Sequence, residues 1–539
     1  MAAGASGGRN ARPPDVVVVV LDCVRAGSFP GTGGPEGAFP VLEAIRDECT
    51  VFTHASTVAP WTLPSHASLF TGRYPWEHGV LGEGRLQYES SLPTVAGALR
   101  EAGYATLGLS ANGLLYPLFA SAGSYEQFRC AEWWEKSFRW IRPESLDRAT
   151  ATRPRNGRNA LAIVARGSLP GHDRTPSLSY LRREEATGSL PDAIRSTRPE
   201  EVALGRTAGT LAWAGLDLSN RLARVFRTPD DPHPLPIAPW IEPTFAAWLA
   251  GQSPERPIHC FVNFLDAHEK YLSDAALVRG LGDWGKFVRI PQNPRLWLEG
   301  DWSPSPDELA LLRRLYEATI DRLSRRVEGL ISALKAAGRW ENTLLIVTSD
   351  HGQAFGEEGE LFHERSPIEP LLHIPLWVRW PRGFEAPRVR TDRVSVIDIA
   401  ATVLVAAHME NPFPNSGVPL QTVPAEPREP PVLAMADGYP TIENYRKRLD
   451  GDLLRRLQRS YGVAYHVGVK AIVGVQNGDI RTFRVGSGSE SASVPGSGTD
   501  AATARATDAA RDVAELLRRA AEGTMDSSVE DRLRSWGYL

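Results

Sequence analysis

Three aspartates each end an apolar run that has the length and composition of a buried strand. The runs are 16–22, 260–266 and 344–350, and they end in Asp22, Asp266 and Asp350. Continuous apolar and β-branched runs of this kind are typical of strands covered on both faces, as in a parallel sheet. Ligands gather at the carboxyl ends of such strands. Three carboxylates brought together there would repel one another unless a cation lay between them, so the pattern predicts a metal site.

Histidines lie close to these aspartates. His351 directly follows Asp350 and precedes Gly352, which lets the backbone turn away. His268 lies two residues after Asp266, and His363 follows an acidic, glycine-containing loop. A single histidine is more often structural than a ligand. Imidazole and carboxylate side chains gathered at strand ends favour a divalent metal instead.

A threonine supplies a candidate nucleophile. Within the segment 61–73, Pro64 suits the first turn of a helix and Gly72 suits its end. Thr62 would then lie at the amino end, among unpaired backbone N–H groups and the positive end of the helix dipole. An anion can be held there and a hydroxyl activated. The alternative is that Thr62 only caps the helix.

Alternating strands and helices must position these residues. Further strands are expected at 104–109 and 374–380, with helices at 41–48, 92–102, 306–337 and 398–407. This order predicts an α/β sandwich with a large, mostly parallel central sheet over residues 15–411. Residues 412–539 are expected to form a small antiparallel α+β subdomain, with strands at 432–435, 463–475 and 480–485 and helices at 509–521 and 529–536. The last two strands meet at Asn477-Gly478, a strong hairpin signal.

Three segments depart from this pattern. Residues 125–257 are rich in arginine and tryptophan and are interpreted as a solvated surface insertion, with a cationic lid as the alternative. Residues 1–14 and the Gly/Ser-rich stretch 486–500 are expected to be disordered.

Net charge, cysteine distribution and the length of apolar runs argue against several classes of protein. The chain has 539 residues and a formal net charge of -4, which gives no sign of nucleic-acid binding. Its four cysteines are scattered, there is no signal-peptide core, and no run of about 18 apolar residues suggests a membrane span. We expect a cytoplasmic protein acting on a small molecule, with its oligomeric state open.

Several motifs in order resemble the sulfatase family of the alkaline phosphatase superfamily. They are Leu21-Asp22, Thr62-Leu63-Pro64-Ser65-His66, residues 69–75, Leu265-Asp266-Ala267-His268, Ser349-Asp350-His351-Gly352, His373-Ile374-Pro375-Leu376 and residues 529–539. The resemblance implies an alkaline phosphatase-like sandwich in which Asp22, Asp350 and His351 hold a metal that touches Thr62. It also implies that Asp266, His268 and His363 line the far side, where two-metal members bind a second ion.

The chain departs from the family at four positions. Sulfatases place Cys or Ser, converted to formylglycine, where this chain has Thr62, and Arg where it has His66. Threonine cannot form that aldehyde, so the chain is closer here to the superfamily's phosphodiesterases and phosphotransferases. Cys23 replaces an aspartate common in sulfatases, which favours zinc or manganese over calcium or magnesium. Lys270 replaces a histidine common in two-metal members, so one or two ions are expected.

These residues predict hydrolysis of a phosphate monoester, phosphate diester or sulfate ester. Thr62 would attack the central atom, with His268 or Lys270 assisting the leaving oxygen. The residues expected to contact the small anionic substrate are Trp61, His66 and Arg73. A phospho-group transferase of the same superfamily and a non-catalytic anion-binding protein are the alternatives.

Overall fold

The computed structural model describes only part of the chain. The described residues are 12–81, 92–115, 124–130, 238–269, 271, 290–292, 294–298, 302–363, 366–409, 412–422, 431–437, 457, 459–486, 489–491 and 500–522. Three expectations fall wholly or mostly outside these ranges. They are disorder in the amino-terminal residues 1–14, the helix at 529–536 and the surface insertion at 125–257.

A central sheet of nine strands runs through the described part of the chain. Its order is β10 (Val389–Arg390), β2 (Cys49–Ser56), β9 (His373–Arg379), β6 (Thr343–Thr348), β1 (Asp15–Leu21), β5 (Ile258–Phe264), β3 (Ala105–Ser110) and β4 (Gln127–Cys130), with β11 (Val394–Ser395) also paired to β2. All pairs between described strands of this sheet are parallel except those of β9. The mostly parallel sheet is therefore confirmed.

The three middle strands run in the same direction and end together. β1 pairs with β6 through Val20 and Thr348, and with β5 through Leu21 and Phe264. Residues that follow these strands therefore leave the sheet at the same end, where the carboxyl ends of the three strands lie. The strands consequently bring the loops that begin with Asp22, Asp350 and Asp266 into one neighbourhood, although side-chain directions differ.

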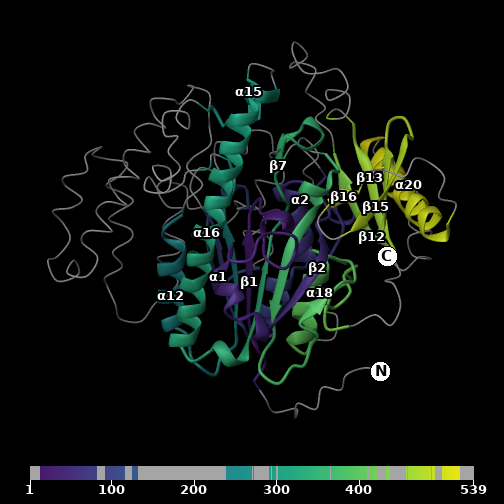
Figure 1. Cartoon of the computed structure of the whole chain (residues 1–539). Helices are drawn as coiled ribbons and strands as arrows, with labels where there is room; N and C mark the ends of the chain where they lie inside the picture. Colours follow the sequence, from purple (N-terminus) through teal and green to yellow (C-terminus); the bar gives the residue numbers. More distant parts are fainter. Residues whose placement is uncertain are drawn as a thin grey trace, which may run out of the picture.

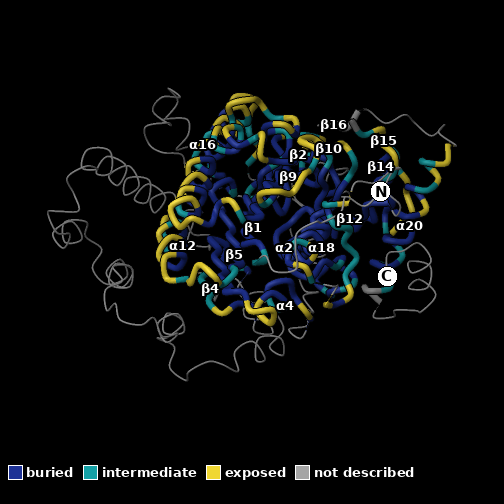
Figure 2. The backbone as a smooth tube through the Cα atoms, turned by 90° about the horizontal axis from the view of Figure 1, so that it is seen from below, coloured by how far each residue is buried: buried dark blue, intermediate teal, exposed yellow. Residues whose placement is uncertain are grey.

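Helices cover both faces of the sheet (Figure 1). On one face, α16 (Pro306–Ala336) and α12 (Ile241–Ala250) pack against odd-numbered β1 residues such as Val17 and Val19. On the other, α2 (Thr62–Thr71), α4 (Val95–Glu101) and α18 (Asp398–Ala406) share a core with Val16, Val18 and Val20. Burial on both faces explains the unbroken valine run. Figure 2 shows the buried interior and the exposed outer sides of α16 and α12.

Short elements complete the main domain. They are α1 (Pro40–Glu43), α3 (Pro75–His78), α15 (Pro294–Leu298), α17 (Glu369–Leu372), the pair β7 (Ala354–Phe355) and β8 (Leu361–Phe362), and the 3-10 turns Ala26–Ser28, Arg46–Glu48, Gly113–Leu115, Trp340–Asn342 and Glu357–Gly359. The helix expected at 41–48 is thus only α1 followed by a 3-10 turn, because β2 already begins at Cys49. Both β4 and α12 fall within the range expected to be a surface insertion, yet they pack with the main domain.

The carboxyl-terminal part forms the expected antiparallel unit. Its strands are β12 (Val432–Ala436), β13 (Tyr461–His466), β14 (Val469–Gly474), β15 (Ile480–Gly486) and β16 (Ser489–Ser491), and α20 (Ala501–Glu522) packs across them. The apolar run 463–475 is two strands, since Val467 and Gly468 form a left-handed turn within it. β14 and β15 meet at Asn477-Gly478 as predicted. The tripeptide of β16 lies inside the stretch expected to be disordered.

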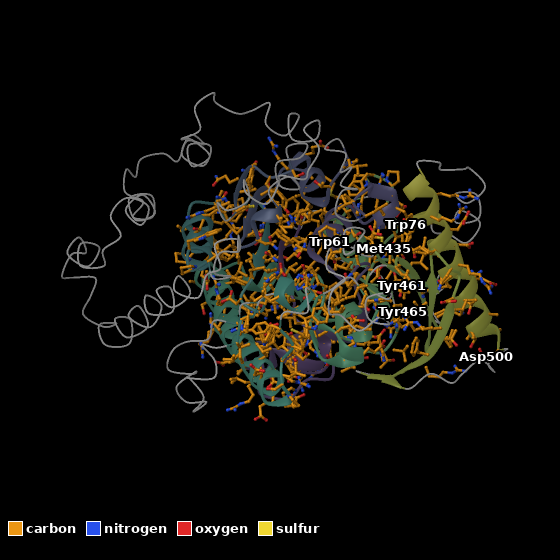
Figure 3. All side chains as sticks on the ribbon, turned by 90° about the horizontal axis from the view of Figure 1, so that it is seen from above. Trp61, Trp76, Met435, Tyr461, Tyr465 and Asp500 are labelled. Carbon is orange, nitrogen blue, oxygen red and sulfur yellow. The ribbon has the colours of Figure 1, made fainter. Side chains whose placement is uncertain are left out.

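A buried ion pair joins this subdomain to the main domain. Lys470 of β14 is fully buried, and its Nζ lies 3.0 Å from a carboxylate oxygen of Glu369, at the start of α17. Tyr465 donates a 2.6 Å hydrogen bond to the same oxygen. Nearer α2, the backbone N–H of Met435 donates to the carbonyl of Val58. In Figure 3, Met435 and Tyr465 lie toward the main domain, whereas Asp500 lies at the outer edge.

No helix in the described residues has both the length and the apolar character needed to cross a membrane.

Replacing Lys470 tests the ion pair. Lys470→Met leaves Glu369 charged and buried without its cation, so we expect the free energy of unfolding to fall by about 3–5 kcal/mol. Urea denaturation followed by circular dichroism measures this loss. The double variant Lys470→Met/Glu369→Gln should recover most of it. Arg511→Met, which breaks an exposed pair with Asp508, should leave the midpoint unchanged, and an equally mild Lys470→Met would contradict the assignment.

Acid should weaken the same pair. Burial alone would raise the pKa of Glu369, but Lys470, Arg393 and His373 lower it to about 2. A carboxylate with a lowered pKa stabilises the fold above its unfolded pKa of about 4.3, and this stabilisation is lost as the pH falls toward the folded value. The difference in unfolding free energy between wild type and Glu369→Gln should therefore shrink below about pH 4.3. A difference that stays constant across this range would argue against the pair.

Candidate active site

The candidate nucleophile begins a buried helix. Trp61 has extended backbone angles at the N-cap position of α2, so Thr62 is the first helical residue and does not act as the cap. The expected helix over this segment is confirmed. It ends at Gly72, whose φ of 66° is left-handed and whose added Cβ would lie within 3.0 Å of Asn415 and Ala400 side-chain atoms. Thr62 Oγ1 lies 3.5 Å from His351 Nε2.

Three of the predicted ligands meet beside Thr62 and form what we call the inner donor group, namely Asp22, Asp350 and His351. His351 Nδ1 lies 3.0 Å from the Gly352 carbonyl oxygen, to which it can only donate, so the Nε2 lone pair faces the group. Nε2 lies 3.4 Å from Asp350 Oδ2 and 4.0 Å from Asp22 Oδ1. All three side chains are almost completely buried.

Backbone and amide groups orient these carboxylates. Asp350 Oδ1 accepts hydrogen bonds from the backbone N–H groups of Cys23 (3.2 Å) and His351 (2.9 Å). Asp22 Oδ2 accepts from the side-chain amides of Asn112 (3.1 Å) and Asn263 (3.4 Å). One oxygen of each carboxylate is thereby held in place, and the other is directed toward His351.

The inner donor group fits a divalent cation. Asp350 Oδ2 is buried and makes no hydrogen bond within the described residues. Ligand atoms held about 2.0–2.2 Å from a tetrahedral ion lie roughly 3.3–3.6 Å apart, close to the 3.4 Å that separates Asp350 Oδ2 from His351 Nε2. Carboxylate oxygen with imidazole nitrogen is a donor set that suits zinc or manganese.

Charge in the buried group leads to the same conclusion. Burial and the neighbouring Asp22 raise the pKa of Asp350 well above its ordinary value. Burial would also raise the pKa of Asp22, but His351, His268 and His66 together lower it. Burial and the neighbouring His363 lower the pKa of His351 to about 3. A cation between the carboxylates would allow both to be ionised.

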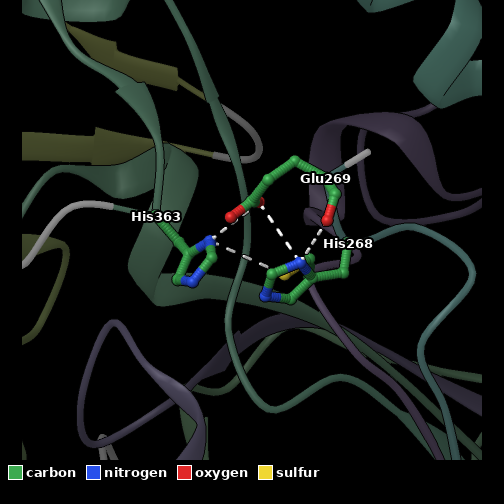
Figure 4. A group of neighbouring side chains, drawn as sticks. His268, Glu269 and His363 are labelled. Atoms are coloured by element: carbon green, nitrogen blue, oxygen red, sulfur yellow. Dashed lines mark hydrogen bonds and ion pairs between the residues drawn. The ribbon is translucent and has the colours of Figure 1, made fainter. Parts of the chain in front are cut away.

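A second cluster, the outer donor group, consists of His268, Glu269 and His363 (Figure 4). Glu269 Oε2 lies 3.3 Å from His363 Nδ1 and 3.5 Å from His268 Nδ1. The His363 ring lies between the other two imidazoles, with its centroid 4.7 Å from His268 and 4.9 Å from His351. Burial would raise the pKa of Glu269, yet the two histidines of the group lower it. The outer group therefore adjoins the inner one.

Asp266 does not join either cluster. Its Oδ2 accepts a 2.6 Å hydrogen bond from Arg326, which also forms an ion pair with Glu242 of α12. The expectation that Asp266 is a metal ligand is therefore corrected, because α16 supplies a buried guanidinium that already neutralises it. Glu269 takes the place of this carboxylate among the donors.

The three residues expected to contact substrate have other neighbours. His66 is fully buried, and its Nδ1 lies 2.9 Å from the Thr62 carbonyl oxygen and 3.5 Å from Asp350 Oδ2, so it lies behind the inner group. Arg73 follows the far end of α2 and donates to the carbonyl of Pro414. Trp61 belongs to the apolar core. None of these contacts is made with the outer group, and substrate binding by these three residues stays a prediction. Lys270 lies outside the described residues.

The sequence interpretation missed Glu269 as a candidate ligand and treated Cys23 only as a departure from a family pattern. Both had a detectable signal, because each directly follows a residue already chosen, His268 or Asp22. Gly352 was expected to permit a turn, but its role is close approach. An added Cβ would lie 1.9 Å from the Pro370 carbonyl oxygen, and its N–H donates to the carbonyl of Leu371 in α17.

Known proteins similar to this chain share its site-bearing regions. A family model described as sulfatase matches residues 247–409, and one described as type I phosphodiesterase / nucleotide pyrophosphatase matches residues 16–217. The steryl-sulfatase of Mus musculus is 26% identical over 441 residues, which is 74% of this chain. The uncharacterized sulfatase YidJ of Escherichia coli (strain K12) is 25% identical over 379 residues, which is 69% of this chain. The alignments span 63% of each of these two relatives.

A solved structure shares the fold. The phosphonate monoester hydrolase of Agrobacterium radiobacter superposes with a TM-score of 0.55 at 16% sequence identity, over 96% of each chain. The alkaline phosphatase-like architecture expected from the sequence is thereby confirmed.

Two aspartate variants separate a ligand from a structural residue. Asp350→Asn should weaken zinc binding at least tenfold, because it removes a negative ligand of the inner group, whereas Asp266→Asn should leave zinc binding unchanged. Asp266→Asn should instead lower the free energy of unfolding by about 3 kcal/mol, the low end for a broken buried pair because Glu242 still neutralises Arg326. Equilibrium dialysis and urea denaturation measure the two effects. Loss of zinc from Asp266→Asn without loss of stability would contradict this division.

Proposed function

We propose that this chain, a relative of sulfatases within the alkaline phosphatase superfamily, is a metal-dependent hydrolase with Thr62 as its nucleophile. Its substrate would be a phosphate monoester, phosphate diester or sulfate ester. The observation that carries this proposal is the position of the Thr62 hydroxyl, at the start of a buried helix and 3.5 Å from His351 Nε2. Oxygens of the inner carboxylates, Asp350 Oδ2 and Asp22 Oδ1, lie 3.4 and 4.0 Å from the same nitrogen.

The inner donor group would hold the catalytic ion, with Asp22, Asp350 and His351 as ligands. We propose zinc or manganese, as one ion or two, because the donors combine carboxylate with imidazole. A divalent ion at this place supplies Lewis acidity, which lowers the pKa of a nearby hydroxyl and stabilises charge on the oxygens of the ester.

Separate protein groups would carry out nucleophilic attack, charge stabilisation and proton donation. The Thr62 hydroxyl gives up its proton to water, and Oγ1 bonds to phosphorus or sulfur in line as the bond to the leaving oxygen breaks. The amino end of α2 stabilises negative charge on the non-bridging oxygens. His268 is within the adjoining outer group and donates a proton to the leaving oxygen. Water then hydrolyses the Thr62 ester and restores the hydroxyl. We retain Lys270 as an alternative proton donor.

The ester would enter from the outer donor group. Thr62 is 3% exposed, whereas the side chains of His268 and His363 are 18% and 20% exposed. A small anionic ester could therefore place its reacting end beside Thr62 and its alcohol beside these histidines. All four cysteines of the chain lie within the described residues and are unpaired, which supports our proposal of a cytoplasmic location.

Replacing Thr62 tests its role directly. We expect Thr62→Ala to lose at least about 10³-fold in turnover, because the attacking oxygen is gone, while Thr62→Ser should keep measurable activity. The assay compares an aryl phosphate, a bis-aryl phosphate and an aryl sulfate with zinc- or manganese-loaded protein.

Thr71→Ala is the matched control. Thr71 lies at the opposite end of α2, where its hydroxyl donates to the Ala67 carbonyl, so its loss should leave turnover close to wild type. Full activity in Thr62→Ala, or equal losses in both variants, would rule out Thr62 as the nucleophile.

A further inference from the structure

Cys23 occupies the point where the inner and outer donor groups meet. Its Sγ lies 3.3 Å from Asp22 Oδ1 and 3.9 Å from His363 Nδ1. Sγ and donor atoms of His268, Glu269 and His363 all lie within 4.8 Å of one another, and the same limit holds for Sγ with Asp22 and His351. Cys23 thus belongs to both sets of potential ligands.

The backbone holds Cys23 in an unusual conformation. Its φ of 65° is left-handed, a region that is sterically unfavourable for a residue with a Cβ. The conformation is fixed from both sides, since its N–H donates to Asp350 Oδ1 and its carbonyl accepts a 2.9 Å hydrogen bond from Tyr316. Backbone strain that the surroundings enforce is characteristic of functional positions.

Hydrogen bonds from a neighbouring side chain also orient the outer donor group. Gln353 donates a 3.2 Å hydrogen bond to Glu269 Oε2 and also contacts the Tyr271 hydroxyl. Hydrogen bonds of this kind orient metal-binding carboxylates. Thiolate, imidazole and carboxylate are together a donor set typical of zinc, and calcium and magnesium prefer oxygen alone.

We propose that Cys23 is a metal ligand shared by two sites, one formed with the inner donor group and the other with His268, Glu269 and His363. This inference rests on the proposed function for the inner ion and adds a second, thiophilic site and its ligands. With an ion in this second site His268 is a ligand, so the proton donor to the leaving oxygen is then Lys270, the alternative named above. On binding, the S–H bond breaks, its proton leaves to solvent, and a sulfur–metal bond forms.

The charges of the site support two ions. Asp22, Asp350 and Glu269 each contribute one negative charge, and a Cys23 thiolate contributes the fourth. Two divalent cations balance these four charges. Asp266 is not part of the count, because Arg326 already neutralises it.

Cobalt(II) is a suitable probe because it takes the same ligands as zinc and absorbs in the near ultraviolet when a thiolate binds it. Full-length protein stripped of metal is titrated with cobalt(II), and bound metal is counted by equilibrium dialysis. We expect two equivalents together with the sulfur-to-cobalt absorption. Cys23→Ser should lose that absorption and weaken binding at least tenfold.

Two controls keep the result interpretable. Cys49→Ser changes another buried cysteine, in β2, and should retain both equivalents and the absorption. Glu269→Gln, with Cys23 intact, should bind one equivalent tightly and keep the absorption from the inner site. This second variant tests the outer site even where Cys23→Ser does not fold.

The inference is overturned when wild-type protein binds cobalt without the sulfur absorption, or when Glu269→Gln still binds two equivalents tightly. Ester cleavage measured on the same samples separates this failure from failure of the proposed function. Cleavage without the absorption removes Cys23 as a ligand and leaves the function standing. The absorption without cleavage supports the shared ligand and contradicts the hydrolase.

Discussion

Two carboxylates buried against each other are the constraint on which this structure depends. Asp22 and Asp350 follow the carboxyl ends of two neighbouring parallel strands, β1 and β6. Both carboxylates are directed at the Nε2 atom of His351. Such an arrangement is costly for a protein alone, since desolvated like charges oppose each other. It becomes favourable when a cation binds. The valine-rich β1, the amide donors around Asp22 and the backbone donors around Asp350 all serve to hold it.

The same constraint explains the position of Thr62, the proposed nucleophile. A helix that begins beside these carboxylates brings its positive end to a place of negative charge. Buried packing along α2 fixes that start without using the Thr62 hydroxyl, because Trp61 takes the cap position. The hydroxyl is therefore left to face His351 Nε2.

Much of this was visible in the sequence, and the errors have physical causes. Asp22 and Asp350 each end an apolar run, and the structure brings their carboxylates together because their strands are parallel neighbours covered on both faces. The same pattern misled at Asp266, because nothing near it in the chain reveals that Arg326 packs against it. β9 reads like any buried strand, and apolar composition does not encode its antiparallel direction. Glu269 and Cys23 were overlooked because a ligand cluster assembles from side-chain directions, which sequence spacing leaves open.

Support for His351 reaches far along the chain. The turn after His351 rests on α17 through Gly352 and Leu371, and α17 in turn is anchored by Lys470 of β14. During synthesis on the ribosome, the inner ligands therefore emerge more than one hundred residues before the strand that secures them. The contacts that support the loop of His351 can therefore be complete only after β14 has been synthesised and has packed against α17.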